Sequence, residues 1–259
     1  MTGAGSGIGR AIALRFAAGG DRVSLLGRRV GELEATVALS EAPHALRAHA
    51  CDVRDRGSVR AAMASAAEAL GPVDVAISNA GIGGPNGPCF QEEGAEDRFD
   101  ELVSTNLGGT YRFFRAALEH LSPEALDAHG GGPRRHLVAV SSILARIGVA
   151  GYSGYCASKA GVSGLVRAMA SELAPLHVQV NAVAPGWVDT DMAREGLDGM
   201  AAAMGISQDE ALAIAMKDVP LGRMGRPEEI AGMVAWLTSV DAQGVTGQTL
   251  DMNGGAFMS

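Results

Sequence analysis

The chain begins with a glycine-rich stretch, Thr2-Gly3-Ala4-Gly5-Ser6-Gly7-Ile8-Gly9, which limits the possible folds more than any other feature. Glycines allow a tight turn and let backbone amides approach a phosphate at the start of a helix. A helical pattern follows over residues 10–18 and a strand pattern over 23–26. This order is typical of a dinucleotide-binding unit, although a flexible leader is an alternative. We therefore predict that the pyrophosphate of such a cofactor contacts Gly3, Ser6, Gly7, Ile8 and Gly9.

One part of this unit is missing. In a doubly wound sheet the phosphate-binding turn follows a buried central strand, whereas only Met1 precedes Thr2 here. Loss of that strand would leave a slot in the core and unpaired backbone groups on both neighbouring strands. We expect that the first central strand is missing, that Met1 stands at the place of its last apolar residue, and that the native start lies upstream.

The rest of the chain alternates between strand and helix patterns. Further strands are expected at 46–51, 73–78, 136–140, 178–183 and 248–252, with helices at 30–40, from 55, at 96–121, up to 173 and at 227–239. The pattern predicts an α/β fold: residues 1–259 as a single doubly wound Rossmann domain, with a parallel sheet covered by helices on both faces. Residues 191–219 contain several methionines among Ala and Gly. They predict either an adaptable apolar lid over a substrate or ordinary amphipathic helix faces.

Composition excludes several classes of protein. The net charge is −8 and the arginines are scattered, so we expect no nucleic-acid partner. No apolar run is long enough to span a membrane, and no secretion signal precedes the first motif. Cys51, Cys89 and Cys156 are too few and too far apart for a disulfide framework or a zinc site. A cytoplasmic protein without a metal is the expectation.

Two strand ends bear on the choice of cofactor. The strand at 23–26 ends in Gly27-Arg28-Arg29, and no acidic residue stands between Val23 and Gly31. An acidic side chain there would bind the ribose diol of NAD, whereas arginine suits a 2′-phosphate, so Arg28 favours NADP(H) over NAD(H). Asp52-Val53 follows the next strand. Asp52 could accept a hydrogen bond from the adenine amino group or merely cap the helix that begins near Asp55.

Three further segments lie where a cofactor would approach the sheet. Asn79-Ala80-Gly81 follows the strand at 73–78, and small residues there suit a close approach of the cofactor. Asn106 lies inside the helix predicted at 96–121, where it either distorts the helix to expose a carbonyl or hold a water, or is a satisfied core amide. The segment Pro185–Thr190 begins with Pro185-Gly186. It is either a plain turn or a rigid one that presents backbone groups near Val188, and the Thr190 hydroxyl, to a carboxamide.

The strongest chemical signal is Tyr155 followed four residues later by Lys159. This spacing places both on one face of a helix. A free tyrosine has a pKa of about 10, and a neighbouring ammonium favours the phenolate, so we expect Lys159 to lower the pKa of Tyr155 toward the working range. The chain has 3 tyrosines and only two lysines, so the spacing has little chance of being accidental. Ser142, at the end of an apolar run, could hold a substrate oxygen from the other side.

With these residues in view, the chain resembles the short-chain dehydrogenase/reductase family over nearly its whole length. The matching pieces are Thr2-Gly3-x-x-x-Gly7-Ile8-Gly9, Asp52, Asn79-Ala80-Gly81, Asn106, Ser142, Tyr155-x-x-x-Lys159, Pro185-Gly186, Gly225-Arg226-Pro227 and Thr246-Gly247-Gln248. Two departures are the missing first strand and Asn253, where the family usually has Asp. The resemblance implies a seven-stranded parallel Rossmann sheet and a homotetramer or homodimer packed through the helices of Asn106 and Tyr155.

The resemblance also implies a mechanism. Hydride from the nicotinamide adds to a ketone carbon while Tyr155 protonates the oxygen, which Ser142 orients. Lys159 lowers the pKa of Tyr155 and binds the nicotinamide ribose, and Asn106 supports a water chain. The substrate is then a small carbonyl compound or alcohol, held by Ser142 and Tyr155 together with Leu144, Tyr152 and Trp187, whose side chains favour an apolar compound.

Two alternatives remain at this stage. Enoyl reductases of the same superfamily place the lysine seven residues after the active tyrosine, and Tyr152 stands at that distance from Lys159. The second alternative is a regulator that senses NADP without turnover. Such a sensor would need none of Ser142, Tyr155 and Lys159.

Overall fold

The computed structural model of the chain describes residues 1–87, 97–121 and 135–258. Its sheet is parallel and consists of two runs of strands. The smaller run pairs β1 (Val23–Gly27) with β2 (Leu46–Ala50), and the larger has the order β3 (Val75–Ser78), β4 (Arg135–Val140), β5 (Val178–Pro185), β6 (Thr249–Met252). Single bridges from Thr2 to Leu26 and to Ser78 join the two runs. The order β2-β1-Thr2-β3-β4-β5-β6 is the doubly wound topology that the sequence predicts.

At the place of the first central strand, the chain contributes only its first three residues. The amide of Leu26 donates to the carbonyl of Met1 at 2.8 Å, and the amide of Thr2 donates to the carbonyl of Ile77 at 2.9 Å. A cavity of about 390 Å³ is lined by the end of α1 (Gly7–Ala18), by Val75 at the start of β3, and by the end of α9 (Pro227–Leu237). Within the described residues, the segment 1–3 bridges β1 and β3 at the place of the first central strand, and no strand is assigned before β1.

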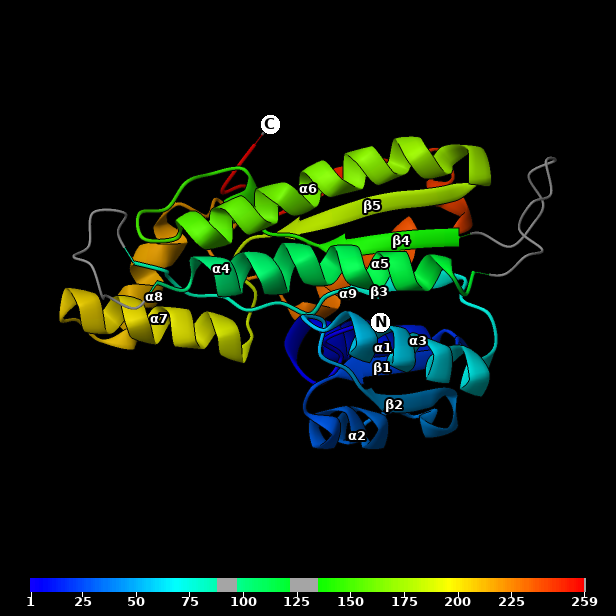
Figure 1. The fold of residues 1–259 in the computed structure, drawn as a ribbon. Helices are drawn as coiled ribbons and strands as arrows, with labels where there is room; N and C mark the ends of the chain where they lie inside the picture. Colours follow the sequence, from blue (N-terminus) through cyan, green and yellow to red (C-terminus); the bar gives the residue numbers. More distant parts are fainter. Residues whose placement is uncertain (88–96, 122–134, 259) are drawn as a thin grey trace.

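Helices cover both faces of the sheet (Figure 1). α1, α9 and α2 (Val30–Ala38) pack on one face, and α3 (Arg56–Leu70), α5 (Gly109–Leu118) and α6 (Ser153–Leu173) pack on the other. The described chain also contains short 3₁₀ turns: η1 (Pro43–Ala45), η4 (Ile143–Ala145), η5 (Ala174–Leu176) and η6 (Val240–Ala242). None of the helices in the described ranges is long and apolar enough to cross a membrane.

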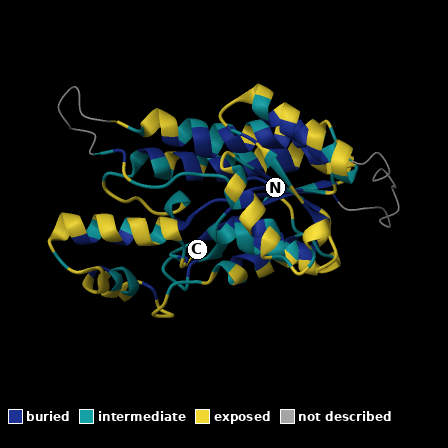
Figure 2. Cartoon of the chain, turned by 90° about the horizontal axis from the view of Figure 1, so that it is seen from below, coloured by how far each residue is buried: buried dark blue, intermediate teal, exposed yellow. Residues whose placement is uncertain are grey.

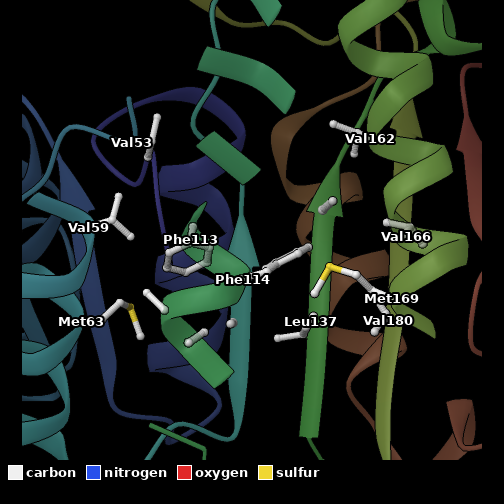
Figure 3. Close-up of a cluster of buried hydrophobic side chains, with 14 of the residues drawn as sticks. Val53, Val59, Met63, Phe113, Phe114, Leu137, Val162, Val166, Met169 and Val180 are labelled. Atoms are coloured by element: carbon white, nitrogen blue, oxygen red, sulfur yellow. The ribbon is translucent and has the colours of Figure 1, made fainter. Parts of the chain in front are cut away.

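The two faces have separate apolar cores because side chains alternate along each strand. On β4, Leu137 and Ala139 face the cluster under α5 and α6, whereas Val138 and Val140 face the cluster under α1 and α9. Figure 3 shows Phe113 and Phe114 of α5 in the middle of the first cluster, between α3 and the sheet. Both phenylalanines are almost fully buried. They pack α5 against the sheet.

The helix expected at 96–121 is not continuous. The described part consists of α4 (Phe99–Leu102), a π-helical segment η2 (Val103–Gly108) and α5, and residue 96 lies outside the described residues. π-Helical turns are rare and occur mostly at functional sites. The wide turn contains Asn106, so the prediction of a distorted helix at that residue is confirmed.

Residues 191–219 form two helices beyond the carboxyl ends of β4 and β5 (Figure 1). Thr190 caps α7 (Asp191–Met204), and a capping box formed by Ser207 and Glu210 starts α8 (Gln208–Lys217). Leu197 and Ala201 pack with Ala211 in a small cluster of their own, while much of the outer surface of α7 is exposed (Figure 2). We call α7 and α8 the lid after the predicted role of this segment; its closure over a substrate stays a prediction, beside the alternative of ordinary amphipathic helices.

Candidate active site

The glycine-rich turn lies at the carboxyl edge of the sheet and is tied to the end of β3. The hydroxyl of Thr2 accepts hydrogen bonds from the amides of Asn79, at 3.2 Å, and Ala80, at 3.1 Å. The side-chain amide of Asn79 donates to the carbonyl of Gly3 at 2.9 Å. A Cβ added at Gly9 would collide with that same carbonyl, so only glycine fits there. The structure therefore brings together two segments that the sequence predicts near the cofactor, and it adds Thr2, whose role sequence reasoning missed.

The turn also meets the segment that follows β5. Gly7 has φ +49°, and a Cβ there would lie 3.0 Å from Cγ2 of Thr190. Ser6 precedes α1, but its side chain makes no capping hydrogen bond and stays free for a ligand. On the same segment, Val188 is buried and pairs with Gly225, and Gly186 lies so close to Asn253 that a Cβ would come within 2.9 Å of its Cα. The glycine cradle and the free helix start fit the pyrophosphate of a dinucleotide.

The adenosine end of such a cofactor would meet Arg28 and Asp52. The register pairs Gly27 with Ala50, so the two residues that follow the paired strands lie at the same edge of the sheet. Arg28 is exposed and has no hydrogen-bond or ion-pair partner within the described ranges. Asp52 forms an ion pair of 2.8 Å with Arg54, whose hydrogen bonds lower the pKa of that carboxyl to about 2. The capping interpretation of Asp52 is wrong, because Asp55 caps α3; Val53, predicted beside it, is buried against Gly109.

Ser142, Tyr155 and Lys159 come together between the end of β4 and the start of α6. Ser142 directly follows Ser141 at the end of β4, and its side chain lies close enough to that of Tyr155, in the first turn of α6, to influence the pKa of the phenol. One turn further on, Nζ of Lys159 lies 5.6 Å from the centroid of the Tyr155 ring. The predicted spacing thus places a phenol, a hydroxyl and an ammonium in one small region.

The charges in this region differ from the expectation. Burial raises the pKa of Tyr155, and the hydrogen bond with Ser142 only partly opposes it. The expected lowering by Lys159 is not found, because the ammonium lies over the ring face and donates to the carbonyl of Val140 at 3.0 Å. Burial lowers the pKa of Lys159 itself to about 8.

Asn106 links the loop after β3 to the helix of Tyr155. Its side-chain oxygen accepts from the amide of Ile82 at 2.9 Å, and its nitrogen donates to the Ile82 carbonyl at 3.1 Å and to the hydroxyl of Ser158 at 3.0 Å. Ser158 in turn donates to the carbonyl of Tyr155 at 2.8 Å. A Cβ on Gly81 would lie 3.1 Å from the Asn106 oxygen and 3.5 Å from Nζ of Lys159. The amide is therefore satisfied in the core and also positions the backbone of Tyr155.

Sequence reasoning missed two serines here. Ser158 is fully buried, and the hydroxyl of Ser141 donates to the carbonyl of Lys159 at 3.0 Å. Both residues stand beside predicted site residues in the sequence. Their type carries no signal by itself, because serine is common on surfaces.

The expected substrate residues lie in different surroundings. Leu144 is half-buried in η4, and Tyr152 is half-buried at the N-cap of α6. The ring of Trp187 lies against α7, with ring carbons 3.6 and 3.7 Å from the Cβ position of Gly196, and it belongs to the lid cluster. Trp187 therefore anchors the lid, and a contact with substrate stays a prediction.

The parallel doubly wound sheet, with a glycine-rich turn and a tyrosine–lysine pair at its carboxyl edge, defines the class of Rossmann-type proteins. A family model described as enoyl-(acyl carrier protein) reductase matches residues 3–256. Among curated relatives, the 3-oxoacyl-[acyl-carrier-protein] reductase MabA of Mycobacterium tuberculosis is 34% identical over 258 residues, which cover 100% of this chain and 92% of MabA. The FabG reductase of Vibrio harveyi is 32% identical over 258 residues, covering 100% of this chain and 96% of FabG.

Solved structures agree. A variant of actinorhodin polyketide ketoreductase with NADPH superposes with a TM-score of 0.87 at 36% identity, covering 98% of this chain and 95% of that one. A short-chain dehydrogenase/reductase from Brucella melitensis superposes with a TM-score of 0.84 at 31% identity, covering 100% and 95%. The chain belongs to the short-chain dehydrogenase/reductase family and is a hydride-transferring oxidoreductase.

Proposed function

We propose that this protein uses NADPH to reduce the ketone of a fairly apolar acyl substrate to a secondary alcohol. The observation that carries this proposal is the grouping of Ser142, Tyr155 and Lys159 beside the glycine-rich turn. The names of the relatives, which include 3-oxoacyl and polyketide ketoacyl reductases, favour a 3-oxoacyl thioester as substrate. The reverse reaction, oxidation of the alcohol with NADP, uses the same groups.

The preference for NADP(H) rests on Arg28. Its exposed guanidinium at the end of β1 is free to pair with a 2′-phosphate, and no acidic residue competes for that position between residues 23 and 31. The actinorhodin ketoreductase structure, which is described with NADPH, supports the same preference.

In the proposed reduction, each side chain of the site has a separate role. A bound nicotinamide supplies the hydride that the carbonyl carbon accepts. Tyr155 donates a proton to the carbonyl oxygen, and its raised pKa keeps the phenol protonated at neutral pH, as a proton donor requires. Ser142 donates a hydrogen bond to the same oxygen and stabilises the developing negative charge. Lys159 stabilises the phenolate that remains, and Asn106 holds the Tyr155 backbone through Ser158.

The lid and Leu144 provide the apolar surroundings of the substrate in this proposal. Met192 at the start of α7 lies against the loop after β3, with its Sδ 3.1 Å from the Cβ position of Gly83. A flexible methionine at that contact suits a segment that opens and closes over a substrate. Small exposed residues on α6, including Ala157, Ala160 and Ala168, leave room for a second copy of the chain and support a homotetramer.

The test compares two tyrosine variants. Tyr155→Phe removes the proton donor and should lower kcat for NADPH-dependent reduction of a 3-oxoacyl thioester by at least about 10²-fold. Tyr152→Phe should change mainly KM. The measurement is loss of NADPH absorbance with a panel of ketones. Full activity of Tyr155→Phe would contradict the proposal.

A second candidate is reduction of an enoyl thioester, which the description of the matching family model favours. Tyr152 would be the proton donor, seven residues before Lys159. Against it, Ser142 influences the pKa of Tyr155, and Nζ of Lys159 lies 5.6 Å from the centroid of the Tyr155 ring. Turnover of enoyl but not 3-oxoacyl thioesters, lost in Tyr152→Phe, would establish this second function. Tight NADPH binding without turnover of any compound would indicate a sensor.

A further inference from the structure

The carbonyl groups of the glycine-rich turn are all engaged by donors from the protein. The carbonyl of Gly3 accepts from Asn79 at 2.9 Å, and that of Ala4 accepts from the hydroxyl of Thr36 at 3.0 Å. The carbonyl of Gly5 accepts from the guanidinium of Arg10, and that of Ser6 accepts from the Arg10 amide at 3.1 Å.

The amides of the same turn are free. Within the ranges that the structure describes, no backbone amide from Ala4 to Gly9 has a hydrogen-bond acceptor. In a planar trans peptide, the carbonyl of one residue and the amide of the next point in opposite directions. Because the carbonyls of Ala4 and Gly5 point toward Thr36 and Arg10, the amides of Gly5 and Ser6 point the other way. The turn therefore presents donors on one side only.

Arg10 is the centre of this arrangement. Its Nε donates to the hydroxyl of Thr36 at 3.1 Å, and the hydroxyl proton is shared between the carbonyl of Ala4, at 3.0 Å, and that of Glu32, at 3.1 Å. Its Nη2 reaches the carbonyl of Gly5 and pairs with Glu32 at 3.3 Å. Thr36 is fully buried in α2, and a Cβ added at Gly5 would lie 2.8 Å from Cβ of Glu32, so the turn rests directly on α2.

We propose that Arg10 is a positioning residue for the cofactor: with Thr36, it holds the carbonyls of Ala4 and Gly5 toward α2, so that the amides of the turn face the cofactor phosphates. The proposal rests on the NADP(H) binding proposed above. Without these bonds, the peptides of the turn could rotate and place carbonyl oxygens beside a phosphate, which would repel it. Arg10 acts through the backbone and does not itself touch the cofactor.

The experiment isolates the phosphate that meets the turn. 2′-AMP carries only the phosphate that Arg28 would bind, whereas 2′,5′-ADP carries also the 5′-phosphate that would meet the turn. Calorimetry gives the dissociation constant of each compound. The dissociation constant of 2′-AMP divided by that of 2′,5′-ADP measures how much the 5′-phosphate contributes to affinity. We expect Arg10→Met to reduce this ratio by about tenfold or more and to change 2′-AMP binding by less than about twofold.

Three further variants separate position from charge. Arg15→Met removes an exposed arginine from the same helix and should leave the ratio unchanged. Thr36→Val keeps every charge but removes the donor to Ala4, so the ratio should fall. Arg10→Lys keeps the charge but cannot reach Gly5, Thr36 and Glu32 together, so it should restore the ratio only in part. Should Arg10→Met fail to fold, Thr36→Val and Arg10→Lys decide the question.

An unchanged ratio in Arg10→Met or Thr36→Val overturns the proposal, as does full restoration by Arg10→Lys, which would show that charge alone matters. A wild-type protein that binds 2′,5′-ADP no better than 2′-AMP also overturns it. Because no step depends on turnover, the outcomes are distinct from those for the proposed function. Binding as expected without reduction of any ketone would remove the function and keep the role of Arg10.

Discussion

At the scale of single residues, burial decides the chemistry of the site more than pairing does. The same desolvation raises the pKa of Tyr155 and lowers that of Lys159. The ordinary pKa values of the two groups, 10.0 for the phenol and 10.5 for the ammonium, are therefore driven apart and reversed in order, so that Tyr155 holds its proton to a higher pH than Lys159 does. The phenol of Tyr155 keeps its proton at neutral pH, whereas the neighbouring ammonium can lose one. The phenol is therefore suited to donate its proton to a carbonyl oxygen.

This arrangement predicts a pH dependence. The pKa of Lys159 is lowered to about 8, so its ammonium is lost as the pH rises through that value. We expect kcat/KM for ketone reduction to be level below pH 8 and to fall by about tenfold per pH unit above it. Lys159→Arg keeps the charge at every pH and should abolish this fall, although its kcat should be lower. A wild-type profile that is level to pH 10 would contradict the assignment.

The same shift has a consequence for stability, with the opposite sign. Between pH 8 and the ordinary value of 10.5, the unfolded chain binds a proton at Lys159 that the folded chain does not. The contribution of this residue to the free energy of unfolding therefore rises with pH across that window. Comparing urea denaturation of the wild type and Lys159→Met at pH 7.5 and 10 measures it. The stability advantage of Lys159→Met should shrink at the higher pH.

Sequence reasoning could find Ser142, Tyr155 and Lys159 because their chemistry and spacing are local. It could not find Ser141 or Ser158, whose roles depend on which carbonyl lies within reach after folding. It also gave the wrong direction for the pKa of Tyr155, since a spacing of four residues carries no information about burial.

At the scale of elements, the order of strands and helices followed from the periodicity of apolar residues, and Asn106 marked a distortion in the helix at 96–121, but the π-helical form of that distortion was not predicted. The π-helical segment η2 coincides with hydrogen bonds from Asn106 to Ile82, which lies 24 residues away. Such a contact is invisible to local propensity. The lid helices were found as a segment, but the packing of Trp187 into their cluster required the structure.

Two helical glycines, Gly9 in α1 and Gly232 in α9, offer a matched pair of substitutions. Gly9→Ala places a methyl group on the carbonyl of Gly3, and should cost about 1–3 kcal/mol of stability and most of the NADPH affinity. Gly232→Ala lies in α9 with nothing within 4 Å, and should stabilise the protein by about 0.5–1 kcal/mol with unchanged affinity. Urea denaturation and NADPH fluorescence measure both effects. Equal behaviour of the two variants would show that the close approach is unimportant.

At the scale of the whole molecule, the sheet consists of two runs of strands that meet at Thr2. The proposed cofactor extends across this junction: Arg28 and Asp52 follow the strands of the smaller run, and Lys159 and Thr190 follow strands of the larger one. A ligand that binds both parts of the folded chain, and not the unfolded chain, stabilises the whole.

This predicts a large thermal shift. NADPH at about a hundred times its Kd should add about 2.7 kcal/mol and raise the Tm by about 5–10 °C. NADH at the same concentration should raise it less, because it lacks the phosphate that pairs with Arg28. Arg28→Asp should reverse the order of the two cofactors, and an unchanged order in that variant would remove the case for NADP(H).

The junction at Thr2 constrains how this enzyme can be altered. The hydroxyl of Thr2 accepts hydrogen bonds from the loop after β3, and the backbone of Thr2 forms the β-bridges that join the two runs of strands. Variant libraries aimed at the turn will therefore show nucleotide affinity and heat tolerance rising and falling together. Diversity placed at the exposed Arg28 leaves the contacts of Thr2 untouched, and is the better route to a changed coenzyme in a protein that still survives expression.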